Sequence, residues 1–382
     1  MARRVFLHIG TPKSGTTYLQ SLWWQHRDAL AGRGLLLPGG DADEQFRAGA
    51  VVRANAGVLA TMGPRERGAW DRVAQESAAW SGDVLVSQEQ LVEASAEQAS
   101  AAVGRLADDG AEVHLVITAR DLVRQVPSAW QQRVKHGSDT TLRRFCRRVA
   151  KDDPGFNFWH HQDVPRVLDR WAVALPPEHV HVVVLPRPGA DRDLLWRRTS
   201  ELLGLDAVGL ATAAPVANET LAPAEIEFLR QVNTHFPGAH LDVATSRRVK
   251  GFMEPRLGRA GRAPARLLLP ADLHPWFVER GNAMVDELAS APWHVVGDLE
   301  DLRPDPEQGA GVDPDAVPDA DVLEVATAFI AAELQARASG PPRAAPAPAS
   351  PRAVRGAGPG PREPASPTTL RRVLRRLTRG GA

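Results

Sequence analysis

Four short runs of aliphatic, mostly β-branched residues constrain the fold of this chain more than any other feature. They occupy residues 5–9, 84–87, 113–118 and 179–185, and longer stretches with helical spacing of apolar residues, such as 94–107 and 164–174, lie between them. Apolar strands that alternate with helices are typical of a parallel sheet covered on both faces. The pattern therefore predicts an α/β fold with a central parallel sheet and flanking helices. Because ligands bind at the carboxyl ends of such strands, the residues after each run are the first candidates for a site.

The first run leads into a small-residue loop that contains a lysine, and then into a helix. The segment is Gly10-Thr11-Pro12-Lys13-Ser14-Gly15-Thr16-Thr17-Tyr18. Its two glycines permit tight turning and close approach of backbone N–H groups to an anion. The helix that follows directs free N–H groups and its positive dipole end at the same place. Hydroxyl donors and the mobile charge of Lys13 complete a predicted phosphate or sulfate site.

The position of the lysine distinguishes two kinds of anion-binding loop. A loop for nucleoside triphosphates has the pattern Gly-x-x-x-x-Gly-Lys-Ser/Thr. Gly10 and Gly15 fit the glycines of that pattern, but Thr16 occupies the lysine position and Lys13 lies inside the loop. The usual clamp for a triphosphate is therefore missing.

Residues 11–17, Thr-Pro-Lys-Ser-Gly-Thr-Thr, resemble the 5′-phosphosulfate loop of sulfotransferases that use 3′-phosphoadenosine 5′-phosphosulfate (PAPS). The resemblance implies a P-loop-like three-layer fold with a helical C-terminal cap. It also implies that Lys13 contacts the oxygen between phosphate and sulfate, and that Tyr18, the only tyrosine in the chain, stacks on adenine. Four residues would then bind the 5′-phosphate: Ser14, Gly15, Thr16 and Thr17.

The same family has a 3′-phosphate motif, in which a strand ends in arginine and serine follows eight residues later. Here Arg120 follows the run at 113–118, and Ser128 lies eight residues further on. An arginine at the carboxyl end of a strand can bind a phosphate through two N–H groups. Ser128 would reach the same group along a helix or across a break at Pro127. The alternative is an ion pair between Arg120 and Asp121.

A third cationic run, Arg247-Arg248-Val249-Lys250-Gly251, is similar to the Arg-Lys-Gly run that closes over the nucleotide in this family. Val249 interrupts the match. Arg248 and Lys250 would be the nucleotide ligands, and a solvated basic loop is the alternative.

Sulfuryl transfer requires in-line attack by a hydroxyl or amine and a base for the acceptor proton. Glu89 follows the run at 84–87 closely and resembles the catalytic glutamate of some carbohydrate sulfotransferases. The alternative is a glutamate placed at a helix N-terminus by the helix dipole. Further candidates follow Ser128 or form a histidine pair: Gln132, Lys135, His136, His160 and His161. The histidine pair has no metal-ligand partner at suitable spacing, so substrate contact or packing is favoured.

Composition excludes several classes of protein. The 46 basic and 46 acidic residues balance, which argues against a general nucleic-acid coat. The one cysteine, Cys146, excludes a disulfide framework and a multi-cysteine metal site, and we expect it to be buried. No apolar run approaches the roughly 18 residues that span a bilayer, and the N-terminus lacks the pattern of a signal peptide. We therefore expect a cytoplasmic protein.

The chain also changes character along its length. From about residue 222 the apolar spacing is mostly helical, whereas residues 339–382 are rich in Pro, Ala and Gly and carry nine Arg and one Glu. We expect a disordered basic tail there, whose alternative role is a weak contact with a membrane surface or a partner. The sulfotransferase domain would span 1–338, with its nucleotide-binding core at about 1–210 and a mostly helical part at about 211–338.

These observations predict a PAPS-dependent sulfotransferase that requires no metal. It would transfer the sulfuryl group to a hydroxyl or amine of a small molecule or carbohydrate and leave adenosine 3′,5′-bisphosphate (PAP). A P-loop-type kinase is one alternative, and only Glu89 is placed to hold its Mg²⁺. A non-catalytic PAP-binding protein is the other.

Overall fold

The computed structural model describes residues 3–153, 155–212, 221–236, 251, 253, 256–257 and 265–338. Contacts divide the chain into two compact units, Met1–Leu334 and Gln335–Ala382, and the sheet and the helices that cover it belong to the first. The sheet has six strands, all parallel, in the order β2-β3-β1-β4-β5-β6. The expected α/β fold with a central parallel sheet is therefore confirmed.

The four strands predicted from the aliphatic runs are present, and two short strands are added. The strands are β1 (Arg4–His8), β2 (Leu35–Leu36), β3 (Asp83–Ser87), β4 (Glu112–Ala119), β5 (Val180–Val184) and β6 (His294–Val296). The two added strands, β2 and β6, form the edges of the sheet. β6 comes from the mostly helical part of the chain, so the sheet is not complete within residues 1–210.

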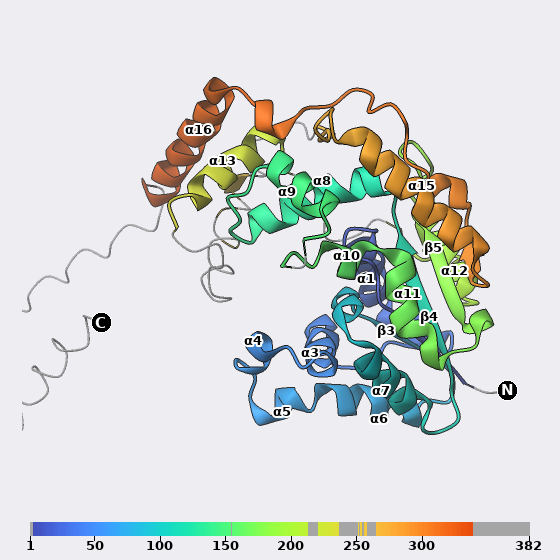
Figure 1. Cartoon of the computed structure of the whole chain (residues 1–382). Helices are drawn as coiled ribbons and strands as arrows, with labels where there is room; N and C mark the ends of the chain where they lie inside the picture. The colour runs from blue at the N-terminus through green and yellow to red at the C-terminus, as the bar shows by residue number, and fades with distance from the viewer. Residues whose placement is uncertain are drawn as a thin grey trace, which may run out of the picture. The chain divides into compact units, whose positions relative to one another are not determined.

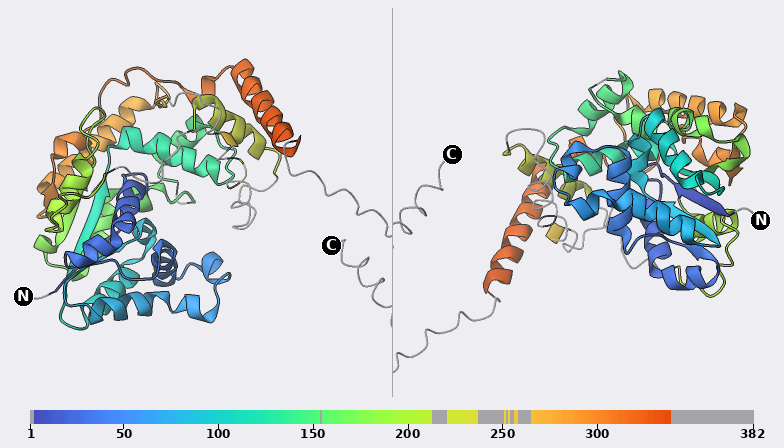
Figure 2. Two further views of the ribbon diagram at one scale, coloured as in Figure 1. Left: turned by 180° about the vertical axis from the view of Figure 1, so that it is seen from behind. Right: turned by 90° about the horizontal axis from the view of Figure 1, so that it is seen from below.

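Helices cover both faces of the sheet, because alternate side chains of each strand enter two apolar layers (Figures 1 and 2). Val5 and Leu7 of β1 enter the layer formed with α6 (Ala69–Ala79), α7 (Ala96–Ala107) and α11 (Val164–Trp171). Phe6 enters the layer formed with α1 (Thr16–Gln25), α2 (Arg27–Gly32) and α12 (Leu194–Leu202). Each fully buried apolar side chain of this size contributes about 1.5–3 kcal/mol, so these layers fix the strand order and the loops beyond it.

A third apolar cluster is helical and lies outside the sheet. It joins α8 (Leu122–Lys135), α9 (Leu142–Ala150), α13 (Pro223–Asn233) and α15 (His274–Ser290). Both α13 and α15 pack against α8, the helix that follows β4. The mostly helical character expected for this part is present, and its role as a cap over an acceptor cleft stays a prediction.

The remaining elements are short, apart from two helices. They are α3 (Ala42–Val52), α4 (Ala56–Leu59), α5 (Pro64–Arg67), α10 (Phe158–Gln162), α16 (Asp319–Ala338), and the 3-10 turns η1 (Glu89–Glu93), η2 (Ala172–Ala174), η3 (Pro177–His179), η5 (Leu299–Leu302) and η6 (Pro314–Ala316). Across the described ranges, no helix is long and apolar enough to cross a membrane.

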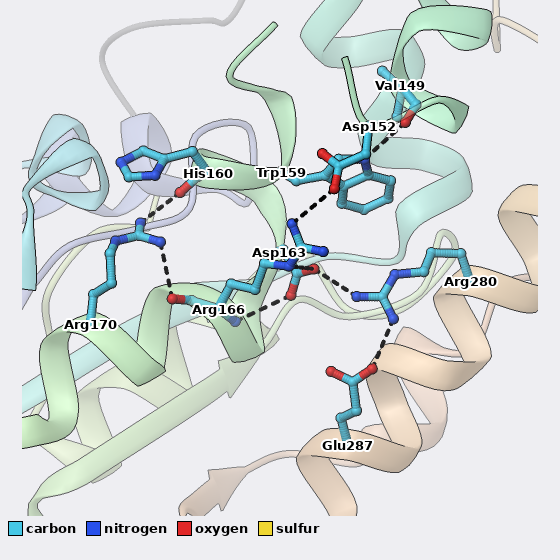
Figure 3. A network of polar contacts seen from close by, with 9 residues as sticks. All are labelled: Val149, Asp152, Trp159, His160, Asp163, Arg166, Arg170, Arg280 and Glu287. Atoms are coloured by element: carbon cyan, nitrogen blue, oxygen red, sulfur yellow. Dashed lines mark hydrogen bonds and ion pairs between the residues drawn. The ribbon is translucent and has the colours of Figure 1, made fainter. Parts of the chain in front are cut away.

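A polar network joins the helices to the turn that carries Glu89. The carboxylate of Asp163 is fully buried, caps α11, and pairs with Arg280 of α15 at 2.7 Å (Figure 3). Arg170 donates to the carbonyl of Val92 at 2.7 Å, and Val92 lies in η1. Breaking a buried ion pair of this kind costs about 3–5 kcal/mol. The network therefore holds η1, and Glu89 at its start, in a fixed place.

Candidate anion site at the carboxyl ends of β1 and β4

The predicted anion loop lies at the point where the sheet changes its winding direction. From β1 the chain passes to the β3 side of the sheet, and from β4 it passes to the β5 side, so the topological switch point, where folds of this kind bind ligands, lies between β1 and β4. Two backbone bonds extend the β1–β4 ladder into the loop. The N–H of Ile9 donates to Val116 at 2.9 Å, and that of Thr11 donates to Thr118 at 2.8 Å.

The loop has a tightly turned backbone. Gly10, Lys13 and Gly15 have φ values of 76°, 71° and 92°. For Lys13, which is not glycine, this left-handed conformation costs about 1–3 kcal/mol, and strain of this kind gathers at ligand sites. Side chains from β4 and α8 hold the loop: Arg120 donates to the Lys13 carbonyl at 3.2 Å, and Gln125 donates to the Pro12 carbonyl.

The start of α1 has the electrostatics of an anion site. Gly15 occupies the cap position without a capping side chain, and the first turn contains no acidic residue. The dipole end of the helix is therefore not neutralised from within α1. Thr17 lies in this first turn and is half-buried.

Two predicted phosphate ligands use their hydroxyl groups inside the protein. The Ser14 hydroxyl lies 2.5 Å from the Thr11 carbonyl and 2.6 Å from the Thr118 hydroxyl, so it anchors the loop to β4. The Thr16 hydroxyl donates to the carboxylate of Glu89. For an anion in the loop, Ser14 and Thr16 therefore offer the turn and helix-terminal geometry of their backbone rather than free hydroxyls.

A buried histidine supports the loop from below. His8 closes β1, and its Nδ1 and Nε2 lie 2.8 Å from the Ser87 hydroxyl and 3.4 Å from the Thr118 hydroxyl. Burial lowers the pKa of His8 to about 3, so the ring is neutral near pH 7. His8 thus ties together the ends of β3, β1 and β4. The sequence analysis did not single it out, although a polar residue closing an aliphatic strand just before Gly10 is a usable signal.

The structure brings the predicted pair Arg120 and Ser128 together. α8 is continuous through Pro127, so the serine faces back toward the end of β4, and Arg120 Nη1 donates to its hydroxyl at 3.1 Å. The same Nη1 contacts the Lys13 carbonyl, so the pair adjoins the loop. The alternative partner, Asp121, pairs with Arg124 and caps α8.

Two neighbouring guanidinium groups at this place have unused donors. Burial, together with the charge of Arg124, lowers the pKa of Arg120 to about 10, which leaves it protonated near pH 7. Arg120 Nε and Arg124 Nη2 are both buried, and neither has a hydrogen-bond partner in the part of the chain that the structure describes. A buried unpaired donor costs about 1–3 kcal/mol, and more when it is charged. An anion with several acceptor oxygens would satisfy both.

Arg124 and Gln125 are residues of this site that the sequence analysis did not nominate. Arg124 donates to the Pro186 carbonyl at 3.3 Å, which places it between the ends of β4 and β5. Gln125 precedes Ser128 by three residues on α8 and therefore lies on the same side of the helix. The sequence signal that could have found them is their spacing of four and three residues before Ser128, which places all three on one side of a helix.

Glu89 is the base candidate that contacts the loop. It is the first residue of η1, directly beyond β3, and it accepts the Thr16 hydroxyl. The candidates on α8 lie further away, because the eight residues from Ser128 to His136 correspond to about 12 Å of helix. Gln132 and Lys135 lie in the last turns of α8, between Ser128 and His136.

The other candidates lie elsewhere. His160 Nε2 faces the Glu93 carbonyl at 3.1 Å. Burial, with the nearby His160 and three arginines, lowers the pKa of His161 to about 4. The expectation that Cys146 is buried is confirmed, and burial raises the pKa of its thiol.

Tyr18 lies on α1, against the apolar layer shared with α12. Its hydroxyl is buried without a hydrogen-bond partner among the described residues, and burial, with Asp193 and Asp191, raises its pKa. Stacking on adenine stays a prediction. Arg248 and Lys250, the candidates of the third cationic run, lie outside the described residues.

Comparisons with protein-family models, with curated proteins and with solved structures found no match to this chain. The interpretation of the site therefore depends on its own geometry and on the resemblance of its loop to the PAPS-binding motif.

Proposed function

We propose that this chain is a PAPS-dependent sulfotransferase whose nucleotide binds at the carboxyl ends of β1 and β4. The observation that carries the proposal is that two neighbouring half-buried arginines, Arg120 and Arg124, each have one buried donor atom without a partner among the described residues. Arg120 also contacts the lysine loop.

The nucleotide has two anionic groups on one ribose, so its site needs two cationic places close together. The loop from Gly10 to Gly15, with Lys13 and the start of α1, takes the 5′-phosphosulfate. Arg120, Arg124 and the Ser128 hydroxyl take the 3′-phosphate. The contact between Arg120 Nη1 and the Lys13 carbonyl, at 3.2 Å, supports this arrangement because it makes the two places adjacent.

PAPS supplies the sulfuryl group, which passes to the acceptor oxygen or nitrogen while the bond from sulfur to the bridging oxygen breaks. The Lys13 ammonium stabilises the negative charge that develops on the bridging oxygen. Glu89 accepts the acceptor proton, and the Thr16 hydroxyl holds its carboxylate at the loop. The left-handed backbone of Lys13 sets the direction in which its side chain leaves the loop.

The test separates the 3′-phosphate from the rest of the nucleotide. The full chain is titrated with PAP, with AMP, and with ATP plus Mg²⁺, and each dissociation constant is measured by calorimetry. We expect PAP to bind more tightly than AMP by about 1.5–3 kcal/mol, the usual contribution of hydrogen bonds to a charged group. In Arg120→Ala this preference is expected to disappear, because PAP affinity falls by more than AMP affinity, which loses only the support that Arg120 gives the loop.

Arg105→Ala is the matched control, because Arg105 lies on α7, away from the site, and pairs with Asp108 at the surface. It should keep the wild-type preference for PAP. Binding of ATP with Mg²⁺ but not of PAP would overturn the proposal in favour of a kinase. PAP binding without transfer to any acceptor, and unaffected by Glu89→Ala, would favour a non-catalytic PAP-binding protein.

A further inference from the structure

A group of five ionisable side chains gathers at the amino end of the sheet, opposite the anion site. They come from β4, from η3 and from the first residues of β5 and β6: Glu112, His114, His179, His181 and His294. The strand register assembles them, since His181 pairs with Val116 on one side and with His294 on the other. Side chains two residues apart on a strand share a face, so His114 and His181 lie on the same face.

Three members of this group have the geometry of a metal site. One ligand atom from each of Glu112, His114 and His179 lies within 4.8 Å of the others. Ligand atoms at about 2.0–2.2 Å from a tetrahedral zinc ion lie about 3.3–3.6 Å apart. Binding would therefore need these side chains to close in by up to about 1.5 Å. The rings of His114 and His179 are already in contact, with centroids 4.2 Å apart.

One nitrogen of His114 is buried and unused. Its Nδ1 lies 2.9 Å from Nε2 of His181, and Nδ1 of His181 lies 2.9 Å from Nδ1 of His294. Nε2 of His114 is buried without a hydrogen-bond partner among the described residues. When His114 donates its Nδ1 proton to His181, Nε2 presents a lone pair.

This hydrogen bond resembles the support that metal-bound histidines usually have. A ligating histidine donates its other ring N–H to a neighbouring acceptor, which fixes the tautomer and the orientation of the ring. His181 is that acceptor for His114, and His294 is the acceptor for His181 in turn. The unused Nε2 and the supported Nδ1 are two separate observations that point to the same ligand.

We propose that Glu112, His114 and His179 bind one divalent transition-metal ion, with His181 orienting His114. Two imidazoles and one carboxylate suit zinc, and they also suit cobalt or nickel. Water would complete the coordination. The neighbouring charges are Arg4 and Asp83, which pair with each other and so nearly cancel.

The role that follows from the position is a structural link. Glu112 and His114 lie at the start of β4, and His179 ends η3, the turn that leads into β5. An ion held by all three would fasten the entry of β5 to that of β4. The proposal does not depend on the proposed function, because no residue of the anion site takes part.

Zinc binding to the untagged full chain tests the proposal. Zn²⁺ alone is titrated by calorimetry, and we expect one ion per chain and a higher melting temperature when it is bound. His181→Ala is expected to weaken zinc affinity by about tenfold to a hundredfold, the usual effect of losing a supporting partner. His114→Ala and His179→Ala should weaken it further.

Two further variants keep the test decisive. Glu112 is exposed, so Glu112→Gln should fold like the wild type and yet lose zinc affinity and the rise in melting temperature. His160→Ala is the control, because His160 and His161 form a histidine pair elsewhere, and it should bind zinc as the wild type does. No stoichiometric zinc binding, or binding that only His160→Ala weakens, would overturn the proposal.

Discussion

Each end of the central sheet contains a histidine, the buried His8 and the half-buried His114, and the two differ in how their ring nitrogens are used. At the carboxyl end, both ring nitrogens of His8 face hydroxyl groups, at 2.8 Å and 3.4 Å. At the amino end, His114 has one nitrogen against His181 and the other buried without a partner in the described part of the chain. A histidine with two partners holds strands together. A histidine with one ring nitrogen that has no partner can bind a ligand through that nitrogen.

The same contrast extends to charge. At the carboxyl end, Arg120 and Arg124 each have one buried donor without a partner among the described residues, which suits an anion rich in acceptors. The amino end has imidazoles and one carboxylate, which suits a cation. Buried polar groups without a partner among the described residues thus indicate whether each end binds an anion or a cation. The strands themselves give no such indication, because both ends share them.

The largest expected effect is at the glycine where the carboxyl-end loop enters α1. Gly15 has φ of 92°, and a Cβ there would lie 2.6 Å from Leu195 Cδ2. Gly15→Ala should therefore destabilise by about 2–5 kcal/mol, combining left-handed strain with overpacking. The measurement is the free energy of unfolding in urea, together with PAP affinity, which we expect to fall sharply.

Gly110→Ala is the matched control, because Gly110 has φ of 81° and nothing within 4 Å of its Cβ position. It should cost only the strain, about 1–2 kcal/mol, and leave PAP affinity unchanged. Equal costs for the two variants would mean that the loop yields easily. The loop at the carboxyl end of the sheet would then not be rigid.

The carboxyl end was predictable from the sequence because its parts are close together along the chain. The loop occupies residues 10–18 in one continuous segment, and Arg120 and Ser128 are separated by two helical turns. Local turn chemistry was enough to nominate the loop, whereas Arg120 and Ser128 were nominated through the resemblance to the 3′-phosphate motif, because an arginine and a serine eight residues apart are a weak signal alone. Gln125 was missed, since only the packed position of α8 shows that it contacts the Pro12 carbonyl.

The amino end could not be predicted in this way. His114, His181 and His294 are far apart in sequence and meet only through the register of β4, β5 and β6. β6 has three residues and β2 has two, too few to show an alternating pattern. Without β6 in the predicted sheet, nothing in the sequence placed His294 beside His181.

A medium-sized effect would sharpen the contrast between the two kinds of histidine. The pKa of His8 is about 3 in the folded protein, against 6.5 ordinarily. As pH falls below 6.5, the unfolded chain takes up the proton first, so the stability from neutral His8 is complete above pH 6.5. It is lost toward pH 3, at up to about 1.4 kcal/mol per pH unit.

His8→Gln removes this titration while keeping a polar side chain between β3 and β4. Between pH 6.5 and 4.5 the wild type should lose about 2.3 kcal/mol more unfolding free energy than the variant does. Urea unfolding at several pH values measures the difference. If the unfolding free energies of the two proteins change in parallel with pH, burial does not keep His8 neutral. His8 would then not act as the support that ties the ends of β3, β1 and β4 together.

The smallest expected effect tests whether the two ends act separately. His114, near the start of β4, and Arg120, just after its end, are six residues apart, about 20 Å at 3.3 Å per residue. Sites more than about 10 Å apart that share no partner usually couple by less than about 0.5 kcal/mol. Saturating zinc should therefore change PAP affinity by no more than about twofold, measured by calorimetry with and without the metal.

Thermodynamic linkage requires the same factor in the reverse titration, of zinc in the presence of PAP. Zinc could also bind the phosphates of the nucleotide instead of the protein. The Glu112→Gln variant would then show the same apparent coupling as the wild type, so this variant is the control. A coupling of tenfold or more that Glu112→Gln abolishes would contradict the separation. β4 would then couple metal binding at its start to anion binding at its end. His8 and His114 would then belong to one coupled unit.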